Sequence, residues 1–271
     1  MPPAAILRRA FNGGTVAPTT VPWTYIVSTG LALVILLWIA QFLNFEAIRA
    51  LDFSVVYEYR YAFLRAVGTT FAITTFAMVV GFAVAVVFAV LIIQGIWPAR
   101  WLVIAYVEVW RNTPLVVQLF WVHFALPTVT GISTTAVQSG VIAITMQSSA
   151  YLTDIARAGI QAVPKGQYEA ATALGLPAWS RWFDVILPQA IRIIIPPLAS
   201  LAIGFFKASA ILSLLSVGEL MTQTKNIAFY THKPIEVMTF AGLIYWVLGY
   251  SFGTATYKLE RFLGSDQRGV R

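Results

Sequence analysis

The chain has 271 residues, of which 59% are hydrophobic and only 11% are charged, and its net charge is +7. A water-soluble globule of this size needs far more charge on its surface, so the composition excludes that class and indicates the lipid bilayer as solvent. The basic residues are scattered singly, which argues against nucleic acid and favours positive loops beside an anionic membrane surface. Cysteine is absent, so disulfide frameworks, thiolate metal sites and thiol nucleophiles are excluded.

Six segments are expected to span the membrane, because each offers the run of roughly 20 apolar residues that a spanning helix needs. The predicted fold class is therefore all-α, an integral membrane helical bundle. The third and fourth spans share one uncharged run and are separated at Pro127 by a turn-rich stretch. The fifth is expected to open with Pro196 and Pro197, which a first helical turn tolerates. The predicted spans are residues 24–43, 66–93, 103–126, 137–157, 193–217 and 237–257.

The amino-terminal segment, with Arg8 and Arg9 ahead of an apolar run, has the outline of a secretory signal. We expect it to be retained as a span. Its apolar core is longer than the about 7 to 15 residues of a signal sequence, and no small-residue cleavage pattern follows it.

The distribution of Lys and Arg predicts the orientation, because cytoplasmic loops are enriched in both. With the amino terminus inside, the inner segments hold eleven of these residues and the outer segments five, so both termini are expected in the cytoplasm. The three arginines of the first outer loop oppose this assignment. The inner set is Arg8, Arg9, Arg100, Arg157, Lys165, Arg181, Arg192, Lys258, Arg261, Arg268 and Arg271, and the outer set is Arg49, Arg60, Arg65, Lys225 and Lys233.

One long polar stretch, residues 158–190, lies on the predicted cytoplasmic side between the fourth and fifth spans. A short helix is expected after Pro164, with a stop at Gly175 and a second short helix that ends at Pro188. The stretch exposes more apolar side chains than a solvated loop needs. The residues alone leave two interpretations: contact with the bilayer or the protein's own helix ends, or a docking surface for a cytosolic partner. The apolar residues are Leu174, Leu176, Trp179, Trp182 and Phe183.

This stretch carries a spaced motif, formed by Glu169, Ala170, Ala171, Gly175, Val185, Leu187 and Pro188. The motif resembles the signature of ABC importer permeases. Two further segments are similar to the polar amino acid branch of that family: residues 108–121, with Asn112 in place of the usual glycine, and residues 148–176, with Asp154 where glutamate is commoner. The fifth span departs from the branch, because Lys207 is followed by Ala208 rather than by aspartate. Within the signature, valine stands at position 185 where isoleucine is usual.

The resemblance covers about residues 66–262 and implies a five-helix importer core with one additional amino-terminal helix. It divides the chain into a tail, extra span and outer loop (1–65), the core (66–262) with a cytoplasmic coupling loop (158–190), and a cytoplasmic tail (263–271). It implies the multi-pass permease subunit of an importer for polar amino acids, working by alternating access in a bacterial-type inner membrane. The residues then expected to couple transport to the ATP-binding subunit are Gly166, Glu169, Ala170, Ala171, Gly175 and Leu176.

The resemblance also implies a pump whose work is divided among several chains. The expected partners are an ATP-binding cassette subunit, a second permease copy or a paralogous permease, an external solute-binding protein and a polar amino acid. ATP and Mg are expected in the partner subunit, because no glycine here is followed by lysine and a phosphate-binding G-x-x-x-x-G-K-[ST] loop is therefore missing. No cofactor, metal or nucleic acid is expected in this chain, and it is expected not to be an enzyme.

Charged residues at predicted membrane depth need a partner, a wet cavity or a role, because each costs at least ~2.5 kcal/mol to insert. Lys207 is expected near the midplane, facing the pore or a neighbouring subunit. Two interpretations remain for Arg111: a pair with Glu108 one turn earlier, or a lining for the route of a zwitterion. Asp154 and Arg157 are spaced for a pair within one helix. The candidate substrate pathway is Arg111, Asn112, Thr113, Gln118, Gln147, Ser148 and Lys207.

Two other classes of function stay open as alternatives. A secondary transporter would show inverted repeats and an acidic site at mid-membrane, and no repeat is visible in the sequence. A membrane-embedded enzyme would need a nucleophile with its base or a metal cluster, and His123 and His232 have no metal-ligand spacing. The importer permease is therefore the leading interpretation.

Overall fold

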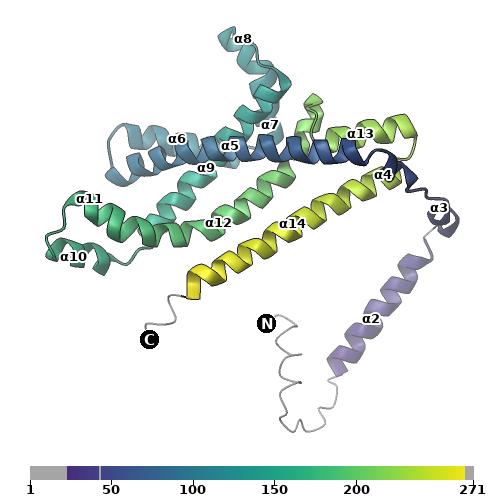
Figure 1. Ribbon diagram of the computed structural model, residues 1–271, viewed down its shortest axis with the longest axis horizontal. Coiled ribbons are helices and arrows are strands. Elements are labelled where there is room, and N and C mark those ends of the chain that lie inside the picture. The colour runs from purple at the N-terminus through teal and green to yellow at the C-terminus, as the bar shows by residue number, and fades with distance from the viewer. Residues whose placement is uncertain (1–22, 43, 266–271) are drawn as a thin grey trace. The chain divides into compact units, whose positions relative to one another are not determined.

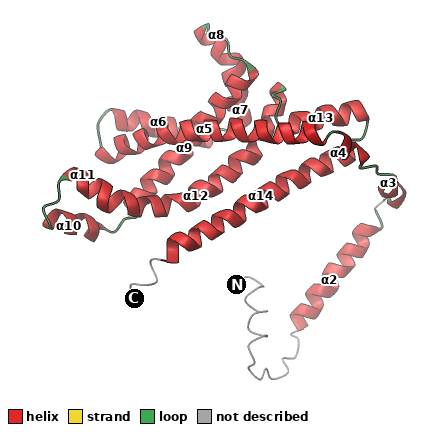
Figure 2. Cartoon of the chain, viewed as in Figure 1, coloured by secondary structure: helices red, strands yellow, loops and turns green. Residues whose placement is uncertain are grey.

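The structure is a computed structural model that describes residues 23–42 and 44–265. Within these residues it contains helices joined by turns and no strand, which confirms the predicted all-α class (Figure 2). The chain separates into two compact units, residues 1–51 and 52–271, each of which is described by itself.

The first unit contains α2 (Trp23–Ala40) and α3 (Phe45–Arg49). Its apolar helix over Val27–Trp38 is shorter than a complete span, and Leu43 of the predicted first span lies outside the described residues. Asn44 begins α3 by accepting a hydrogen bond from the backbone N–H of Ala47 at 3.0 Å. This is the usual way in which a short polar side chain satisfies a free N–H at a helix start.

The second unit is a set of helices that follow one another with short connections (Figure 1). Its carboxy-terminal helix lies beside α12, and α5 lies along α9. The helices are α4 (Ser54–Glu58), α5 (Arg60–Gln94), α6 (Ala99–Asn112), α7 (Leu115–Phe120), α8 (Leu126–Thr130), α9 (Ala136–Gln161), α10 (Lys165–Ala173), α11 (Ala178–Ser180), α12 (Leu187–Ala208), α13 (Leu220–Thr231) and α14 (Pro234–Ser265), with two π-helical segments, η1 (Trp121–Ala125) and η2 (Arg181–Ile186), and the 3₁₀ segment η3 (Ser209–Leu215).

Three helices of the described residues are long and apolar enough to span a bilayer: Arg60–Gln94, Ala178–Leu215 and Pro234–Leu259. The pair Ala99–Asn112 and Leu115–Thr130 adds a fourth only if it counts as one span, because it bends by 108°. Helix α9 has 26 residues but carries many Gln, Ser and Thr side chains, so it does not reach the same hydropathy. Length and hydropathy therefore support fewer spans than the six predicted.

The third predicted span, 103–126, is not one straight helix. Thr113 and Pro114 both take extended backbone conformations, with ψ of 135° and 137°, and α7 begins at the next residue. The ring of Pro114 disfavours a helical conformation at Thr113 and removes one N–H donor, which explains the interruption.

Two other prolines predicted as boundaries lie within continuous helix. Pro127 and Pro188 each follow a π-helical segment and occupy the first turn of α8 and α12, respectively. A proline cannot donate to the carbonyl four residues earlier, and the wider π turn accommodates this loss. The fifth span therefore begins well before residue 193, and Pro196 and Pro197 lie inside α12 instead of opening it.

Helices α5 and α9 approach closely because small residues lie at their contact. Ala77 and Ala85 of α5 are fully buried, and a Cβ atom added at Gly81 would lie 2.4 Å from Ser148 Oγ of α9. In a bilayer, close approach of this kind supplies packing energy that the hydrophobic effect does not give between apolar helices.

Glu219 fixes the junction between the span Ala178–Leu215 and α13. Its side chain is fully buried and accepts hydrogen bonds from the N–H of Met221 (2.9 Å) and Thr222 (2.7 Å) at the start of α13. The hydroxyl of Tyr245 on α14 donates to the same carboxylate at 3.4 Å. The N–H of Leu220 donates to Thr70 Oγ1 of α5 at 3.1 Å, so the junction is tied to two other helices.

Candidate functional site

The predicted coupling loop is a helical hairpin formed by α10, a turn at Gly175, and α11 with η2 (Figure 1). Gly175 has a φ of +68°, and Leu176 N–H donates to Ala171 O at 3.1 Å across the turn. This is the helix end that glycine favours, because a left-handed residue with a Cβ atom is strained there. The stop predicted at Gly175 is confirmed.

Side chains on the inner side of the hairpin hold it together as one body. Ala171, Val163 and Ile186 are nearly completely buried, the last two packed with Ile194 of α12. Arg181 donates to the hydroxyl of Thr172 at 3.1 Å, which joins η2 to α10. The π-helical segment η2 continues directly into α12, so the hairpin and that helix are continuous in the chain.

The outer side of the hairpin exposes Glu169 and Ala170 together with apolar side chains. Leu174 is 78% exposed and Trp179 is 69% exposed, with the Trp179 ring stacked on Phe183 at 3.7 Å. Ala171 is 2% exposed and packs inside the chain, so of the two alanines expected to take part in coupling only Ala170 lies on this outer side. Gly166 is exposed, and Leu176 is half-buried at the turn.

The interruption at Thr113 and Pro114 leaves backbone carbonyls without their helical donors, and side chains satisfy them. Gln118 Nε2 donates to Trp110 O at 2.7 Å and to Thr113 O at 2.9 Å, and Gln147 Nε2 of α9 donates to Thr113 O at 3.1 Å. Tyr151 donates to Arg111 O at 3.2 Å. In lipid an unsatisfied carbonyl costs several kcal/mol, so this set of donors is what permits the break.

Four charged side chains connect α6 to α9 beside this break. Arg111 forms an ion pair with Asp154 and approaches Glu108 at 3.8 Å, while Arg157 approaches Asp154 at 3.5 Å. The predicted pairs within each helix are both present, and the contact between Arg111 and Asp154 joins them. Asn112 Nδ2 adds a hydrogen bond of 2.7 Å to Glu108 Oε2. The guanidinium of Arg111 is therefore already engaged by two carboxylates.

Of the remaining candidates, Ser148 and Lys207 lie apart from this break. Ser148 is fully buried against Gly81 of α5 and donates to Thr145 O at 3.1 Å. Lys207 is exposed on α12 and extends over Gly249 of α14, where an added Cβ would lie 3.0 Å from its Cε atom. The structure thus brings five of the seven pathway candidates together at the break and leaves two outside.

Lys207 lies in an open groove of about 470 Å³. The exposed rings of Trp246 and Tyr250 stack at 5.8 Å along one wall, and Tyr257 lines the groove further along α14. Within the part of the chain that the structure describes, no acidic side chain pairs with Lys207.

Much of the chain matches a known protein family. Residues 97–264 match the family of binding-protein-dependent transport system inner membrane components. The chain belongs to this family. The matched part of this permease contains every residue predicted for coupling and for the pathway.

Relatives of this permease are named as amino acid transport proteins. The arginine transport system permease protein ArtQ of Bacillus subtilis is 35% identical over 198 residues, covering 73% of this chain and 90% of that protein. The glutamate/aspartate import permease protein GltK of Escherichia coli is 33% identical over 199 residues, covering 71% and 89%.

Solved structures support the same fold. A crystal structure of an amino acid ABC transporter with histidines matches with a TM-score of 0.73 and 34% identity, covering 78% of this permease and 99% of that chain. An inward-facing MetNI methionine ABC transporter matches with a TM-score of 0.65 at 20% identity, which shows the shared fold alone.

Several residues of the permease that matter at these sites were not predicted. Tyr151 and Tyr106 of the break region are ordinary aromatic residues in sequence, and only their hydroxyl contacts distinguish them: Tyr106 reaches Ser149 Oγ at 2.7 Å. Trp246 and Tyr250 follow each other by one helical turn, a spacing that predicts a shared face but not a neighbouring lysine. No group of metal-binding side chains occurs within the described residues.

Proposed function

We propose that this permease imports polar amino acids as one subunit of an ATP-driven pump. The observation that carries the proposal is its likeness, at 34% identity, to an amino acid ABC transporter over 99% of that chain. The named relatives carry arginine in one case and glutamate or aspartate in another. Because those side chains are polar but of opposite charge, the relatives support polar α-amino acids as the class of cargo and leave the charge of the side chain open.

The partners are an ATP-binding cassette subunit, a second permease copy or a paralogue, and an external binding protein. The hairpin α10–η2 docks on the ATP-binding subunit, which holds ATP and Mg in the cytosol. Exposed Glu169, Ala170 and Leu174 supply a charged, close-fitting and apolar surface for this contact. Closure of the ATP-binding subunits then moves the hairpin and, through η2, the span that contains α12, which gives alternating access.

The cargo meets this chain at the Lys207 groove. The ammonium of Lys207 offers a charge partner for the carboxylate that all α-amino acids share, and the rings of Trp246 and Tyr250 offer π faces for their ammonium group. Arg111 has a supporting role, because Asp154 and Glu108 already engage its guanidinium. Arg111 instead stabilises the interrupted helix and its packing against α9. The pathway candidates that share this structural role are Asn112, Thr113, Gln118, Gln147 and Ser148.

Reconstitution of the permease with its ATP-binding subunit and binding protein tests the proposal. We expect uptake of a labelled polar amino acid to require both ATP and the binding protein. Unlabelled arginine, glutamine or glutamate should compete selectively with this uptake. Leucine serves as the apolar control cargo. Uptake driven by an ion gradient without the ATP-binding subunit would contradict the proposal.

A further inference from the structure

The Lys207 groove carries one positive charge that nothing in its described lining balances. Apart from Lys207, this lining consists of aromatic residues, glycine and threonine. The ion pairs found among the described residues join other side chains and leave Lys207 out. An occupant of the groove therefore meets an ammonium whose charge is still uncompensated.

This ammonium lies at membrane depth. It extends over Gly249 of α14, which belongs to the spanning helix Pro234–Leu259. Gly249 is about 22 Å from the start of that helix, at about 1.5 Å per residue. A charge at such a depth is costly to leave unpaired and needs a partner of opposite sign. The groove is therefore most stable when its occupant brings negative charge.

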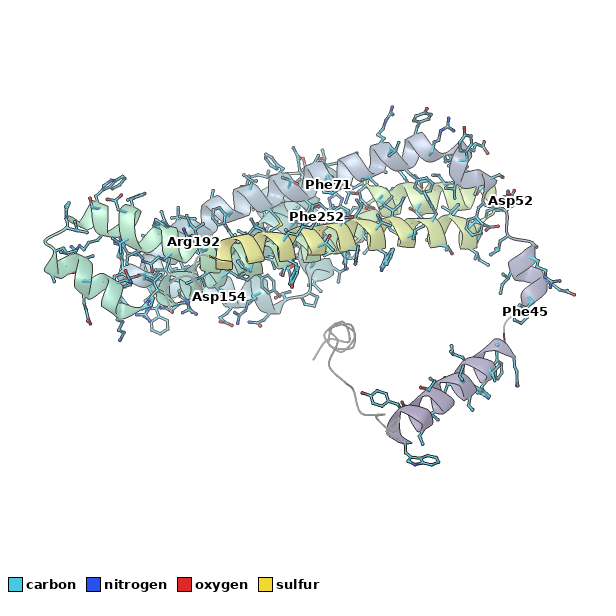
Figure 3. The ribbon with its side chains drawn as sticks, turned by 60° about the horizontal axis from the view of Figure 1, so that its bottom comes forward. Phe45, Asp52, Phe71, Asp154, Arg192 and Phe252 are labelled. Atoms are coloured by element: carbon cyan, nitrogen blue, oxygen red, sulfur yellow. The ribbon has the colours of Figure 1, made fainter. Side chains whose placement is uncertain are left out.

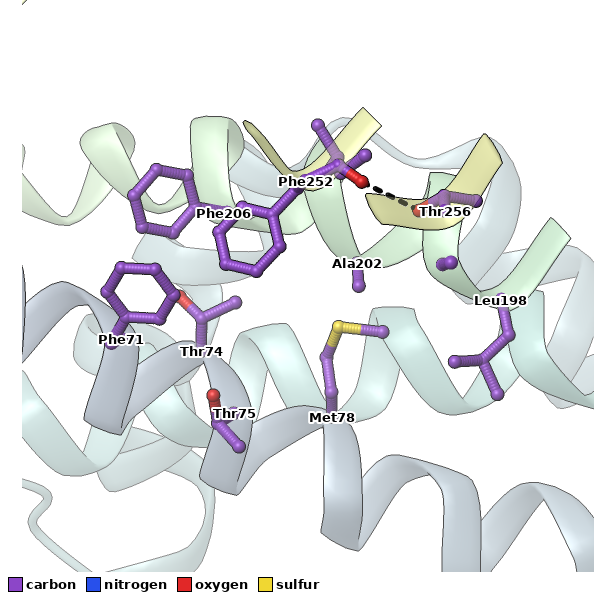
Figure 4. Close-up of a pocket in the computed structure, with 11 residues that line it drawn as sticks. Phe71, Thr74, Thr75, Met78, Leu198, Ala202, Phe206, Phe252 and Thr256 are labelled. Carbon is purple, nitrogen blue, oxygen red and sulfur yellow. Dashed lines mark hydrogen bonds between the residues drawn. The ribbon is translucent and has the colours of Figure 1, made fainter. Parts of the chain in front are cut away.

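A neighbouring cavity on the same helix pair differs in its chemistry. Its volume is about 290 Å³, it lies among α5, α12 and α14, and none of the described residues that line it is charged (Figure 4). Phe252 lines this cavity, and its ring centroid lies 5.4 Å from that of Phe71 (Figures 3 and 4). Nothing there would repay the desolvation of a charged molecule. Of the two hollows, the Lys207 groove is the one that suits a charged cargo.

The side chain of the cargo decides the net charge of the filled groove. The α-ammonium and α-carboxylate of an amino acid cancel, so a neutral side chain leaves the charge of Lys207 unbalanced. A cationic side chain adds a second positive charge, and like charges repel strongly where the dielectric constant is low. An anionic side chain brings the sum to zero. Electrostatics therefore favour acidic amino acids over neutral ones and disfavour basic ones.

The groups along the groove can hold both ends of an acidic amino acid. An ammonium has three N–H donors, so Lys207 can serve the α-carboxylate and the side-chain carboxylate together. Trp246 and Tyr250 are both 64% exposed, with their stacked ring centroids 5.8 Å apart, which leaves π faces for the α-ammonium. No acidic group lines the groove within the described residues, so the guanidinium or second ammonium of a basic cargo finds no partner there.

We propose that the Lys207 groove selects amino acids with an anionic side chain, such as glutamate and aspartate, and rejects basic ones. Lys207 is then the residue that determines specificity for the charge of the side chain, a choice that the proposed function leaves open. This assignment rests on the proposed function, because it takes the groove as the place where the cargo binds. Its own test is the order of cargo affinities, which is measured without transport.

The test measures binding to the permease purified with its ATP-binding subunit in lipid nanodiscs. ATP and the external binding protein are left out, so that the selectivity belongs to the membrane-embedded complex. Scintillation proximity with labelled glutamate, glutamine and arginine gives the three affinities. We expect glutamate to bind about tenfold more tightly than glutamine, as one added charge-assisted contact predicts, and arginine to bind most weakly. Equal affinities, a preference for arginine, or no binding of glutamate would overturn the inference.

Two substitutions of nearly equal size at Gly249 separate charge from shape. A Cβ atom added there would lie 3.3 Å from Nζ of Lys207, so Gly249→Asp places a carboxylate beside the ammonium, whereas Gly249→Asn adds the same bulk without charge. We expect Gly249→Asp to bind glutamate about tenfold more weakly than Gly249→Asn does, and to bind arginine more tightly. Gly242→Asp, the same change earlier on α14 and outside the groove, should keep the wild-type order of affinities. Equal glutamate affinity of the Asp and Asn variants at 249 would refute the role of charge.

Transport separates the failure of this inference from the failure of the proposed function. In the reconstituted system, uptake of arginine that requires ATP and the binding protein would uphold the proposed function and overturn the acidic preference. Uptake of glutamate that depends on an ion gradient alone would contradict the proposed function, while the acidic preference of the groove would stand.

Discussion

Arg111 of α6 and Asp154 of α9 form an ion pair across 43 residues of sequence. The pair lies beside the break at Thr113 and joins two helices that also share an apolar cluster containing Val103, Val107 and Ala150. It therefore ties the interrupted helix to α9 next to the interruption.

Breaking this pair should lower stability and leave cargo affinity nearly unchanged. The side chains are 36% and 23% exposed, so solvent screening limits the coupling to about 1 kcal/mol. A double-mutant cycle of Arg111→Met and Asp154→Asn, followed by thermal unfolding in detergent, measures it. Arg100→Met is the exposed control. Additive effects of the two changes, or a raised KM for uptake in Arg111→Met, would contradict the supporting role.

Gly175 should tolerate only residues that accept a left-handed backbone. Its φ of +68° costs roughly 1 to 2 kcal/mol for a residue with a Cβ atom, and Asn is the least strained of these. We expect Gly175→Val to abolish uptake while the protein still inserts, and Gly175→Asn to retain much of it. Uptake and cargo-stimulated ATPase activity in the same vesicles provide the measurement. Equal activity of both variants would exclude a backbone requirement.

Glu169→Lys tests the partner contact of the same hairpin without altering its fold, since Glu169 is exposed. We expect the ATP-binding subunit to dissociate or to hydrolyse ATP without regard to cargo, because the charge facing it is reversed. Glu46→Lys, the same change on α3, is the control. If the hairpin only contacts lipid, both variants will couple ATP hydrolysis to cargo transport as the wild type does.

Lys207→Met should reduce uptake without preventing insertion, because removal of a charge from a membrane-spanning helix eases integration. Gly249→Leu should have a similar effect by displacing the lysine, since even a Cβ atom there would lie 3.3 Å from Nζ. Gly68→Leu is the control, with no atom near an added Cβ. Full uptake by well-expressed Lys207→Met would assign the lysine a structural role.

Glu219 should make stability depend on pH. Burial raises the pKa of its carboxyl above the ordinary value of 4.5, so the folded state binds the proton more tightly than the unfolded state. This contribution to stability is complete below pH 4.5 and is lost as pH rises through the folded pKa. We expect Glu219→Gln to gain stability relative to the wild type over that rise, as measured by thermal unfolding. Parallel pH profiles would contradict the raised pKa.

Both termini should be cytoplasmic, as the distribution of Lys and Arg predicts. Reporter fusions at the carboxy terminus and near Lys225 should label opposite sides of the membrane. Labelling on the same side would overturn the predicted topology, including the cytoplasmic position of the coupling hairpin.

The sequence by itself determined the membrane class, the all-helical fold and the hairpin with its turn at Gly175. These features depend on composition, on local periodicity and on one residue type whose backbone freedom is distinctive, so neighbouring residues are sufficient to predict them. The segment from Glu169 to Pro188 resembles a permease signature. This resemblance pointed to the family that the comparisons then showed.

Only the tertiary structure decided how the polar residues within the apolar helices are used. Pro114 predicts a disturbed helix, but the donors that permit a complete break come from Gln118, Gln147 and Tyr151. Pro196 opens no helix, because the preceding π segment lets the chain remain helical from Ala178. Ala171 and Ala170 are neighbours of the same residue type, yet the fold buries the first and exposes the second. These outcomes depend on specific side-chain and packing contacts, some of them between residues distant in the chain such as Gln147 and Thr113, and local sequence does not record their free energies.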